Sequence, residues 1–367
     1  MSGDSSVSSA EVVLGFLEEA ESWRLLSPQF PSKVGGKPAW LSQRGLPSLL
    51  GLECEICRLP MAFLLQVYAP ISGQDRSFHR TLFLFCCRTH ECYAANDSRC
   101  MKVFRSQLQR RNEFYPYDPP PEDEPPSGPE PDQSVLSVSG VKLCWVCGCP
   151  GNKACSRCHS VTYCGKHHQT LHWKHTHKRE CGSQEAPTVT TSTFLFPESE
   201  LVTEPEEEEE KKEEDTKEAE EEEEEERSAD CPSLADTLAE TDLEEMAMHE
   251  TEDNKVFQRF KKRIAPEPHQ VVRYSRGGSP LWVSSQHIPS DEDIPPCTCG
   301  AKRIFEFQVM PQLLNSLCVD STGASIDWGT LAVYTCSASC NHDDEYRLEF
   351  IWKQDFSSDQ HAQMKPT

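Results

Sequence analysis

The sequence predicts a β-rich α+β fold. Two similar β units, one in each half of the chain, are separated by an inserted cysteine- and histidine-rich module and a disordered acidic linker. Three observations support this prediction. Short runs rich in β-branched and aromatic residues occur in both halves, as expected for strands. Pairs of cysteines precede and follow these runs, and the chain has 19 cysteines in 367 residues. A chain of this length accommodates two or three domains.

The two halves resemble each other around one glutamine. Gln66 lies nine residues after Cys57, and Gln308 lies nine residues after Cys299. In each half the glutamine stands in an apolar run, and a second apolar run leads into the next cysteine pair. The matching runs are FLLQVYAP at 63–70 with FEFQVMP at 305–311, and HRTLFLFCC at 79–87 with WGTLAVYTC at 328–336. We infer an internal repeat of one β unit.

Each β unit carries enough cysteines to close a tetrahedral zinc site, in which protein atoms fill all four positions. In the first unit we prefer Cys87 to Cys86, because a turn after Cys87 reaches Cys92. Cys86 ends an apolar run and is explained as a buried thiol. Gly300, directly after Cys299, suits the tight turn of a zinc knuckle. The predicted ligands are Cys54, Cys57, Cys87 and Cys92 in the first unit, and Cys297, Cys299, Cys336 and Cys340 in the second.

The central segment adds eight potential ligands in four closely spaced pairs. They are Cys144, Cys147, Cys155, Cys158, Cys164, His168, His177 and Cys181. Thiolates and imidazoles at these spacings predict two further zinc ions, because histidine has no role in a disulfide framework. His167 is the adjacent alternative, and we prefer His168 because it leaves a gap of three residues after Cys164. With one ion in each β unit, we expect about four zinc ions per chain.

The net charge of the chain is −24, and much of it lies in one segment. Residues 204–226 contain 17 acidic side chains and 3 lysines. A chain this acidic is not expected to bind nucleic acid by neutralising phosphates, but it attracts strongly basic proteins. Two interpretations of the segment therefore stay open: a solvated linker without a partner, and a surface that meets a basic partner.

The composition also predicts boundaries along the chain. A stretch rich in Pro, Glu and Asp precedes the central module, and linkers of this kind pass few contacts between neighbours. Apolar spacing predicts a helix over Leu234–Met248 that continues into Val256–Ile264 after a break. Phe194–Pro197 are apolar enough to dock on another part of the chain. The predicted divisions are a β unit at 11–115, a Pro-rich linker at 116–140, the central module at 141–182, an acidic linker at 183–233, and a helix with the second β unit at 234–356.

Neither a membrane segment nor an enzyme is expected from these patterns. No signal-peptide pattern is evident at the N-terminus, and no apolar run approaches the roughly 18 residues of a membrane span. The cysteines therefore indicate metal ligation in a reducing compartment. Every predicted metal site is closed by protein ligands, which leaves no open position for a catalytic water.

The central segment resembles the MYND zinc finger, a protein-interaction module. Tyr163 stands where that family carries an aromatic residue before the fifth ligand. Ligand pairs alternate between the two ions in this family. The resemblance implies one ion held by Cys144, Cys147, Cys164 and His168, and a second held by Cys155, Cys158, His177 and Cys181.

Five other segments extend the resemblance over nearly the whole chain. They are FPSKVGGKPAW at 30–40, LQVYAP at 65–70, Phe114–Tyr115 after the VFRSQL segment that starts at Val103, CTCGAKR at 297–303, and QVMPQLL at 308–314. Together they resemble the programmed cell death protein 2 family. That family is similar to the yeast twenty-S-rRNA-accumulation factor, which lacks the finger.

This resemblance implies a dedicated chaperone for uS5, a basic protein of the small ribosomal subunit, that supports maturation of the 40S subunit. It also implies a location in the cytoplasm and the nucleus. The alternative is a MYND-finger scaffold in transcriptional regulation or apoptosis-linked signalling, which binds proline-rich peptides and corepressors. Neither interpretation requires direct contact with nucleic acid or with a membrane.

Overall fold

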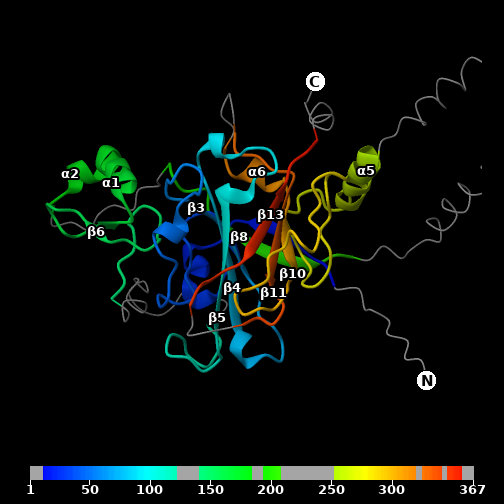
Figure 1. Cartoon of the computed structure of the whole chain (residues 1–367). Coiled ribbons are helices and arrows are strands. Elements are labelled where there is room, and N and C mark those ends of the chain that lie inside the picture. The colour runs from blue at the N-terminus through cyan, green and yellow to red at the C-terminus, as the bar shows by residue number, and fades with distance from the viewer. Residues whose placement is uncertain are drawn as a thin grey trace, which may run out of the picture.

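One continuous sheet of eleven strands forms the body of the protein (Figure 1). The structure is a computed structural model, and it describes residues 11–121, 140–183, 193–207, 252–319, 325–340 and 345–357. The predicted β-rich fold is confirmed, and the described residues contain few helices. The two halves do not form separate sheets, however, because strands from both halves join in this single one.

The strands come from nearly every described part of the chain. The sheet contains β1 (Val13–Glu18), β2 (Lys33–Val34), β3 (Ala62–Tyr68), β4 (His79–Cys86), β5 (Met101–Leu108), β8 (Ser199–Pro205), β9 (Val272–Tyr274), β10 (Arg303–Val309), β11 (Thr330–Cys336), β12 (Arg347–Leu348) and β13 (Phe350–Gln354). The central module has β6 (Lys153–Ala154), β7 (Thr162–Tyr163), α1 (Lys166–His172), a π-helix (Trp173–His177) and α2 (Lys178–Glu180). Two more α-helices are α5 (Glu252–Ile264) and α6 (Leu313–Ser316). Short 3₁₀ turns lie at Ser22–Leu25, Ser27–Gln29, Leu50–Leu52, Asp75–Ser77, His90–Cys92 and Ser98–Cys100.

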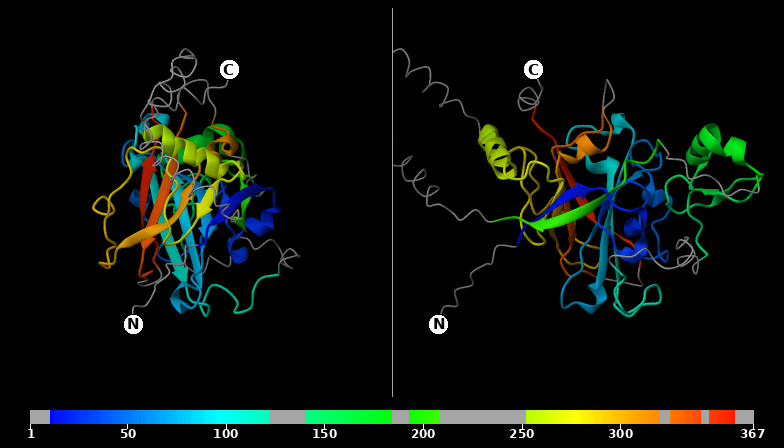
Figure 2. Two further views of the ribbon diagram at one scale, coloured as in Figure 1. Left: turned by 90° about the vertical axis from the view of Figure 1, so that its right-hand side faces the viewer. Right: turned by 180° about the vertical axis from the view of Figure 1, so that it is seen from behind.

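The strand order is β12-β5-β4-β3-β2-β8-β1-β9-β10-β11-β13. Strands β1 and β8 form an antiparallel ribbon at the middle of this order, and Figure 2 shows them side by side in the view from behind. On either side of the ribbon follow a short strand and then a long hairpin. At the far ends, β12 pairs with β5 and β13 pairs with β11. Only Glu349 separates β12 from β13, so one segment bridges both ends of the sheet.

The hairpins β3–β4 and β10–β11 have matching registers. Both are antiparallel, and each has a register shift at one position, between Phe63 and Leu65 in β3 and between Phe305 and Phe307 in β10. These shifts stand at the same distance from Gln66 and Gln308. A β-bulge bends its strand and increases its twist, so both hairpins curve at the same place.

The side chain of each repeated glutamine binds the loop that follows an earlier strand, β2 for Gln66 and β9 for Gln308. The side-chain carbonyl of Gln66 accepts a hydrogen bond of 2.9 Å from the backbone N–H of Ala39, and that of Gln308 accepts one of 2.5 Å from Leu281. Both glutamines are buried. The two loops share the pattern G-G-x-P-x-W, at residues 35–40 and 277–282. The pattern is visible in the sequence, but the repeat was inferred above without it.

One strand lies inside the range predicted to be an acidic linker. Residues 199–205 form β8, which pairs with β1 on one side and β2 on the other. The linker prediction is wrong for these residues, because the pairing partners that make them a strand are remote in the sequence. Helix α5 includes the predicted helix over Val256–Ile264. The predicted helix over Leu234–Met248 lies outside the described residues.

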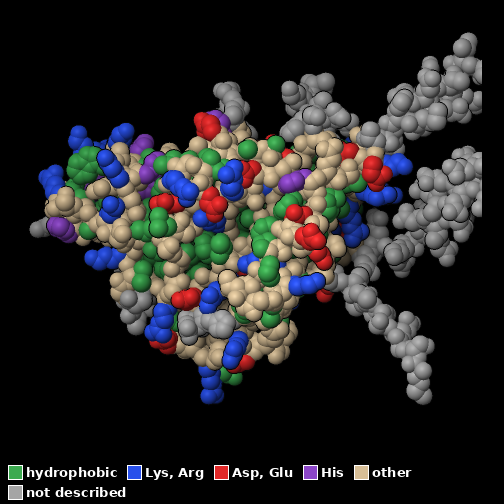
Figure 3. Space-filling model, in the orientation of Figure 1, with side chains coloured by type: hydrophobic (Ala, Val, Ile, Leu, Met, Phe, Trp, Pro, Cys, Tyr) green, Lys and Arg blue, Asp and Glu red, His purple; other side chains and the backbone are tan. Residues whose placement is uncertain are grey.

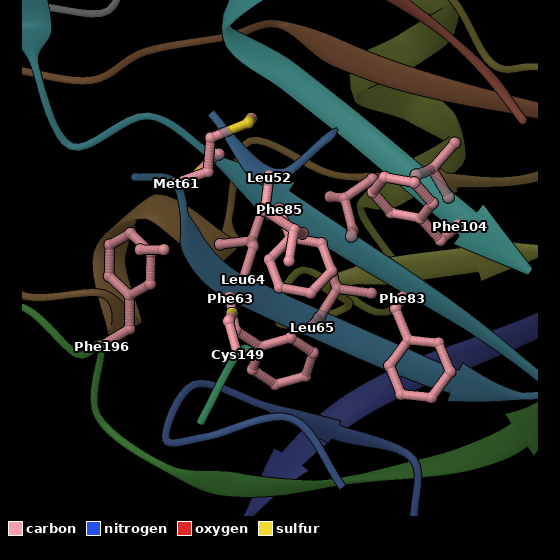
Figure 4. Packing of buried hydrophobic residues seen from close by; sticks show 14 of the residues in the cluster. Leu52, Met61, Phe63, Leu64, Leu65, Phe83, Phe85, Phe104, Cys149 and Phe196 are labelled. Carbon is pink, nitrogen blue, oxygen red and sulfur yellow. The ribbon is translucent and has the colours of Figure 1, made fainter. Parts of the chain in front are cut away.

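Large aromatic side chains fill the core between the strands (Figure 4). Phe63, Phe83 and Phe85 are fully buried on β3 and β4. Strand β4 is buried along its whole length, which explains its continuous apolar run at 82–86. Phe196 packs in the same cluster, so the predicted docking of Phe194–Pro197 is confirmed. Among the described helices, none combines the length and the apolar character that a membrane crossing requires.

Buried ion pairs also link the two halves of the chain. Arg80 on β4 contacts Glu306 on β10 through two hydrogen bonds, of 2.7 and 2.9 Å, and both side chains are fully buried. Arg105 on β5 contacts Glu349, which also accepts a bond from Arg303. The pairs Arg80–Glu306 and Arg105–Glu349 join residues from opposite halves of the sequence. The first of them ties the two hairpins together.

Candidate metal centres

The structure brings the sixteen predicted metal ligands together in four clusters. In each cluster the four ligand atoms lie within 4.8 Å of one another. The clusters are Cys54, Cys57, Cys87 and Cys92; Cys144, Cys147, Cys164 and His168; Cys155, Cys158, His177 and Cys181; and Cys297, Cys299, Cys336 and Cys340. The grouping within the central module is the alternating one that its resemblance to the MYND finger implied.

The distances within the clusters fit tetrahedral zinc. A Zn–S bond of about 2.3 Å places two sulfur ligands roughly 3.8 Å apart. The Sγ atoms of Cys297 and Cys340 are 3.5 Å apart, and those of Cys299 and Cys336 are 3.6 Å apart. A disulfide would need about 2.05 Å, so these cysteines are spaced for a shared ion and not for a bridge. The donor sets of all four clusters are compatible with zinc.

The helices of the central module orient its histidine ligands. Nδ1 of His168, on α1, lies 3.0 Å from Sγ of Cys164 and 3.6 Å from Sγ of Cys144. Nε2 of His177, at the end of the π-helix, lies 3.5 Å from Sγ of Cys158. His167 is exposed and belongs to none of the clusters among the described residues.

A left-handed residue follows the second cysteine of every opening pair. The φ angle is 60° at Arg58, 71° at Gly148, 57° at His159 and 87° at Gly300. In all four turns the N–H of this residue donates a hydrogen bond to the carbonyl of the first cysteine of the pair, as Gly300 does to Cys297. A non-glycine residue in this conformation carries strain that the surrounding structure must offset. The four knuckles therefore share one geometry, although only two of them contain glycine at this position.

Cys86 and Cys87 have different surroundings. Cys87 ends β4 and its Sγ lies 3.5 Å from that of Cys57, inside the first cluster. Cys86 is fully buried and outside the cluster, and burial raises the pKa of its thiol to about 12. In the matching register of the second hairpin, Cys336 occupies the place of Cys87 and Thr335 that of Cys86. Cys86 and Thr335, which directly precede these two ligands, are therefore both buried in the core.

The central module docks on the sheet, contrary to the expectation of few contacts. The indole N–H of Trp40 donates a buried hydrogen bond of 2.8 Å to the carbonyl of Gly148. The ring of Phe194 contacts that of His168 at 4.2 Å between centroids. Cys149 packs among the core aromatics, as Figure 4 shows. A Pro-rich connection does not prevent docking when the module presents apolar surface of its own.

A groove of about 1220 Å³ runs along this docking interface. Its walls come from the first 3₁₀ turn, the loop after β2, the central module and the segment before β8. The apolar side is provided by Leu25, Trp145, Leu171 and Phe196, and the basic side chains are Lys37, Arg88 and Arg179. The Lys37 ammonium lies 5.4 Å from the Trp145 ring, and burial lowers its pKa. Glu180 and Glu198 also line the groove, which therefore combines an apolar wall with charges of both signs. Such a groove suits an extended peptide.

Replacement of Gly148 by alanine should weaken the docking of the central module. A Cβ atom there would lie 2.9 Å from Cβ of Lys37. Gly182 is the matched control, since its φ of +90° is also left-handed, it follows a cluster cysteine, and no atom lies within 4 Å of the added Cβ. Both variants carry the backbone strain, but only Gly148→Ala adds a clash costing roughly 1–3 kcal/mol.

Limited proteolysis of the module and thermal unfolding measure this difference, with metal content as a check that both variants keep their clusters. Equal behaviour of Gly148→Ala and Gly182→Ala would contradict a tight contact at this interface.

Three family models match the chain. The model "Programmed cell death protein 2, N-terminal domain" matches residues 11–122, and "Programmed cell death protein 2, C-terminal putative domain" matches residues 254–355. The MYND finger model matches residues 144–181. Programmed cell death protein 2 of Bos taurus is 49% identical over 354 residues, which cover 96% of this chain and 98% of that protein. The chain belongs to the programmed cell death protein 2 family.

More distant relatives have narrower matches. Human programmed cell death protein 2-like is 28% identical over 329 residues, covering 84% of this chain and 85% of that protein. Probable 20S rRNA accumulation protein 4 of Schizosaccharomyces pombe is 35% identical over 98 residues, or 24% of each chain. No solved structure matches the chain. The resemblance stated from the sequence is thereby confirmed at the level of the family.

The regions matched by the family models do not include every strand of the sheet. Strand β8, in the middle of the sheet, lies outside all three matched regions. It pairs with strands that the N-terminal domain model covers. In this member of the programmed cell death protein 2 family, the sheet is therefore completed by a segment between the finger and the C-terminal domain.

Proposed function

We propose that this chain is a dedicated chaperone that binds the basic small-subunit ribosomal protein uS5 and supports 40S subunit biogenesis in the cytoplasm and the nucleus. The observation that carries this proposal is the similarity to a protein named for 20S rRNA accumulation. A free ribosomal protein is strongly basic and is normally neutralised by RNA. A chaperone of net charge −24 keeps such a client soluble by offering carboxylates in place of phosphates.

The central ribbon of the sheet supports the proposal with a concentration of glutamates. Strands β1 and β8 and their flanks carry Glu11, Glu18, Glu19, Glu21, Glu198, Glu200, Glu204, Glu206 and Glu207. Among the described residues, Lys33 pairs with Glu198, Arg24 lies 3.4 Å from Glu200, and Arg263 and Arg273 pair with Glu206. The glutamates on β1 and its flanks, Glu11, Glu18, Glu19 and Glu21, take part in no ion pair within the described residues. This acidic ribbon is the surface that we assign to the basic client.

The register of the ribbon adds a physical reason for it to bind a cationic partner. Glu18 on β1 stands directly opposite Glu200 on β8. Like charges opposite each other destabilise an antiparallel pair, by an amount comparable to the roughly 0.2–1 kcal/mol of a favourable pair. A bound cationic segment would remove this repulsion, so the ribbon gains stability from the partner it attracts.

Neutralising the ribbon should slow capture of uS5. We expect the triple variant Glu18→Gln, Glu19→Gln and Glu21→Gln to associate with purified uS5 about tenfold more slowly at low salt, because each exposed charge contributes up to about 1 kcal/mol. The effect should fade at high salt, since charges on the surface act mainly on the association rate and are screened. Stopped-flow or surface-based association kinetics across a salt series measure this.

The matched control removes three acidic charges elsewhere: Asp291→Asn, Glu292→Gln and Glu267→Gln, all at exposed positions. It should associate at the parent rate. Equal rates for the ribbon variant and the control would exclude the ribbon as the capture surface. Failure of the parent protein to bind uS5 at all would exclude the proposed function itself.

A second candidate function is favoured by the groove beside the finger. Its apolar wall with Trp145 and Leu171, and its basic side chains, suit a proline-rich peptide of a transcriptional corepressor. Capture of partners from cells under RNase distinguishes the two functions. A single ribosomal protein as the dominant partner supports the chaperone, whereas corepressors support the scaffold. Both are binding functions and neither involves catalysis.

We further propose that the four clusters each hold one structural zinc ion. Four protein donors in each cluster would close the coordination shell, as in structural sites. Two clusters would fix the fold of the finger. The other two would clamp the open ends of the β3–β4 and β10–β11 hairpins, which keeps the binding surface rigid.

A further inference from the structure

Helix α5 carries a row of cations on an otherwise acidic protein. Lys255, Arg259 and Lys262 recur every three to four residues, so they lie on one face of the helix, and all three are exposed. The opposite face packs into the protein through Phe257 and Phe260, which are buried. Figure 3 shows Lys and Arg side chains gathered at this end of the molecule, over α5. We call Lys255, Arg259, Lys262 and Arg263 the basic face of α5.

The basic face has few acidic partners in the described part of the chain. No ion pair within described residues involves Lys255, Arg259 or Lys262. A cavity of about 370 Å³ beside the face is lined by Arg259, Arg263 and Arg273. Arg263 and Arg273 already bind one carboxylate, that of Glu206, whereas Arg259 has no ion pair within the described residues. Arginine binds carboxylates in a bidentate geometry, so this recess suits a further anionic group.

The chain itself makes the first contact with this surface. Glu206 follows β8 directly, and its carboxylate lies 2.5 Å from Arg263 on α5 and 2.8 Å from Arg273 on β9. Glu206 is also one of the first residues of the acidic run. Glu207 follows directly, and this described stretch ends there, so the acidic run leaves the described structure at the basic face.

We propose that the acidic segment 208–226 of this chain docks on the basic face of α5 and shields it from other polyanions. The charges are complementary: residues 204–226 carry 17 acidic side chains and 3 lysines, and Lys255, Arg259 and Lys262 on α5 have no ion pair within the described residues. The contact continues one that exists, from Glu206 to Arg263 and Arg273. The segment is the occupant, and the site is formed by α5 and β9.

The geometry of the chain favours an intramolecular occupant over an external one. The segment begins beside Arg263, and the chain returns to the first turn of α5 at Glu252. A helix of 13 residues is about 20 Å long. The 19 residues of the segment could span at most roughly 60 Å, so the segment is long enough to reach every cation of the face. Because the segment is covalently attached beside Arg263, its docking is intramolecular and is favoured over that of a free polyanion with similar contacts.

Zero-length carbodiimide crosslinking of the full chain tests the contact directly. Amide bonds between glutamates of 208–226 and Lys255 or Lys262 should form at low salt and be lost at high salt, because the attraction is screened. Lys174 and Lys178 on the finger are exposed controls that lie away from α5. Crosslinks from the segment to these control lysines at the same yield would overturn the proposal.

Heparin chromatography tests the shielding. A chain without residues 208–226 should elute at higher salt than the full chain, because the basic face is uncovered. Adding Arg259→Gln and Lys262→Gln to the deletion should reverse that shift, whereas Lys174→Gln and Lys178→Gln should leave it in place. In the full chain both double variants should elute with the parent. An unchanged elution after deletion, or reversal by the control pair, would overturn the proposal.

Discussion

Replacement of Cys297 by serine should unfold the C-terminal hairpin and lower the stability of the whole sheet. Metal binding supplies about 10–16 kcal/mol per site in small zinc modules, whereas the folding free energy of an entire domain is roughly 5–15 kcal/mol. The cluster joins the turn before β10 to the end of β11. Loss of one thiolate leaves three ligands and removes most of this contribution. Circular dichroism and thermal unfolding measure the effect, and chelation of the parent protein should reproduce it.

Cys318→Ser is the matched control, since Cys318 is exposed and lies outside the four clusters. It should unfold like the parent. Elemental analysis should give about four zinc ions per chain for the parent and for the control, one for each closed cluster. A reproducible value near two would mean that the clusters in the sheet are not metal sites, and the expected unfolding of Cys297→Ser would then have no basis.

Breaking the buried pair between Arg80 and Glu306 should cost about 3–5 kcal/mol of folding free energy, because Arg80→Met leaves a carboxylate without its main partner in the core. Both side chains are fully buried. The remaining contacts of Glu306, with Arg276 at 3.2 Å and Tyr274 at 2.7 Å, place the loss toward the lower end of this range. Urea unfolding of the purified variant measures it.

Arg44→Met is the matched control, because Arg44 pairs with Glu113 at the surface and both side chains are 53% exposed. Exposed pairs contribute about 0–1 kcal/mol, so this variant should stay near the parent. The double variant Arg80→Met and Glu306→Leu should recover part of the loss, since no buried charge remains. A cost for Arg80→Met no larger than that of Arg44→Met would contradict the importance of the pair.

The same pair predicts a dependence on pH. Burial alone would raise the pKa of Glu306, but Arg80 and the hydrogen bonds of Thr335 and Tyr274 more than offset it and hold the pKa below its ordinary value. A lowered native pKa stabilises the fold above the unfolded-state pKa, and that stability is lost as pH falls through the native one. The difference in unfolding free energy between the parent and Arg80→Met should therefore become smaller as the pH falls from the ordinary glutamate pKa through the lowered pKa of Glu306. A protonated Glu306 carries no charge for Arg80 to pair with.

The sequence by itself determined the groups of potential ligands and the hairpins that carry them. Ligand spacing is a local property, so pairs such as Cys297 and Cys299 were recognisable without any knowledge of the fold. Strands β3 and β10 were readable because short runs enriched in β-branched and aromatic residues are typical of strands. The matching positions of Gln66 and Gln308 indicated a repeat, and family models and relatives confirmed the family that the segments resembled.

Only the tertiary structure decided how these parts combine. Strand β8 has the sequence SELVTEP, with few apolar residues, and it is a strand because β1 and β2 offer backbone partners on both sides. Arg80 and Glu306 are 226 residues apart, and no local pattern shows that two such charges will meet in the core. The docking of the finger through Trp40 and Gly148 is likewise a contact between distant segments. Local spacing fixes chemistry within a turn or a strand, whereas contacts across the sheet depend on which strands become neighbours.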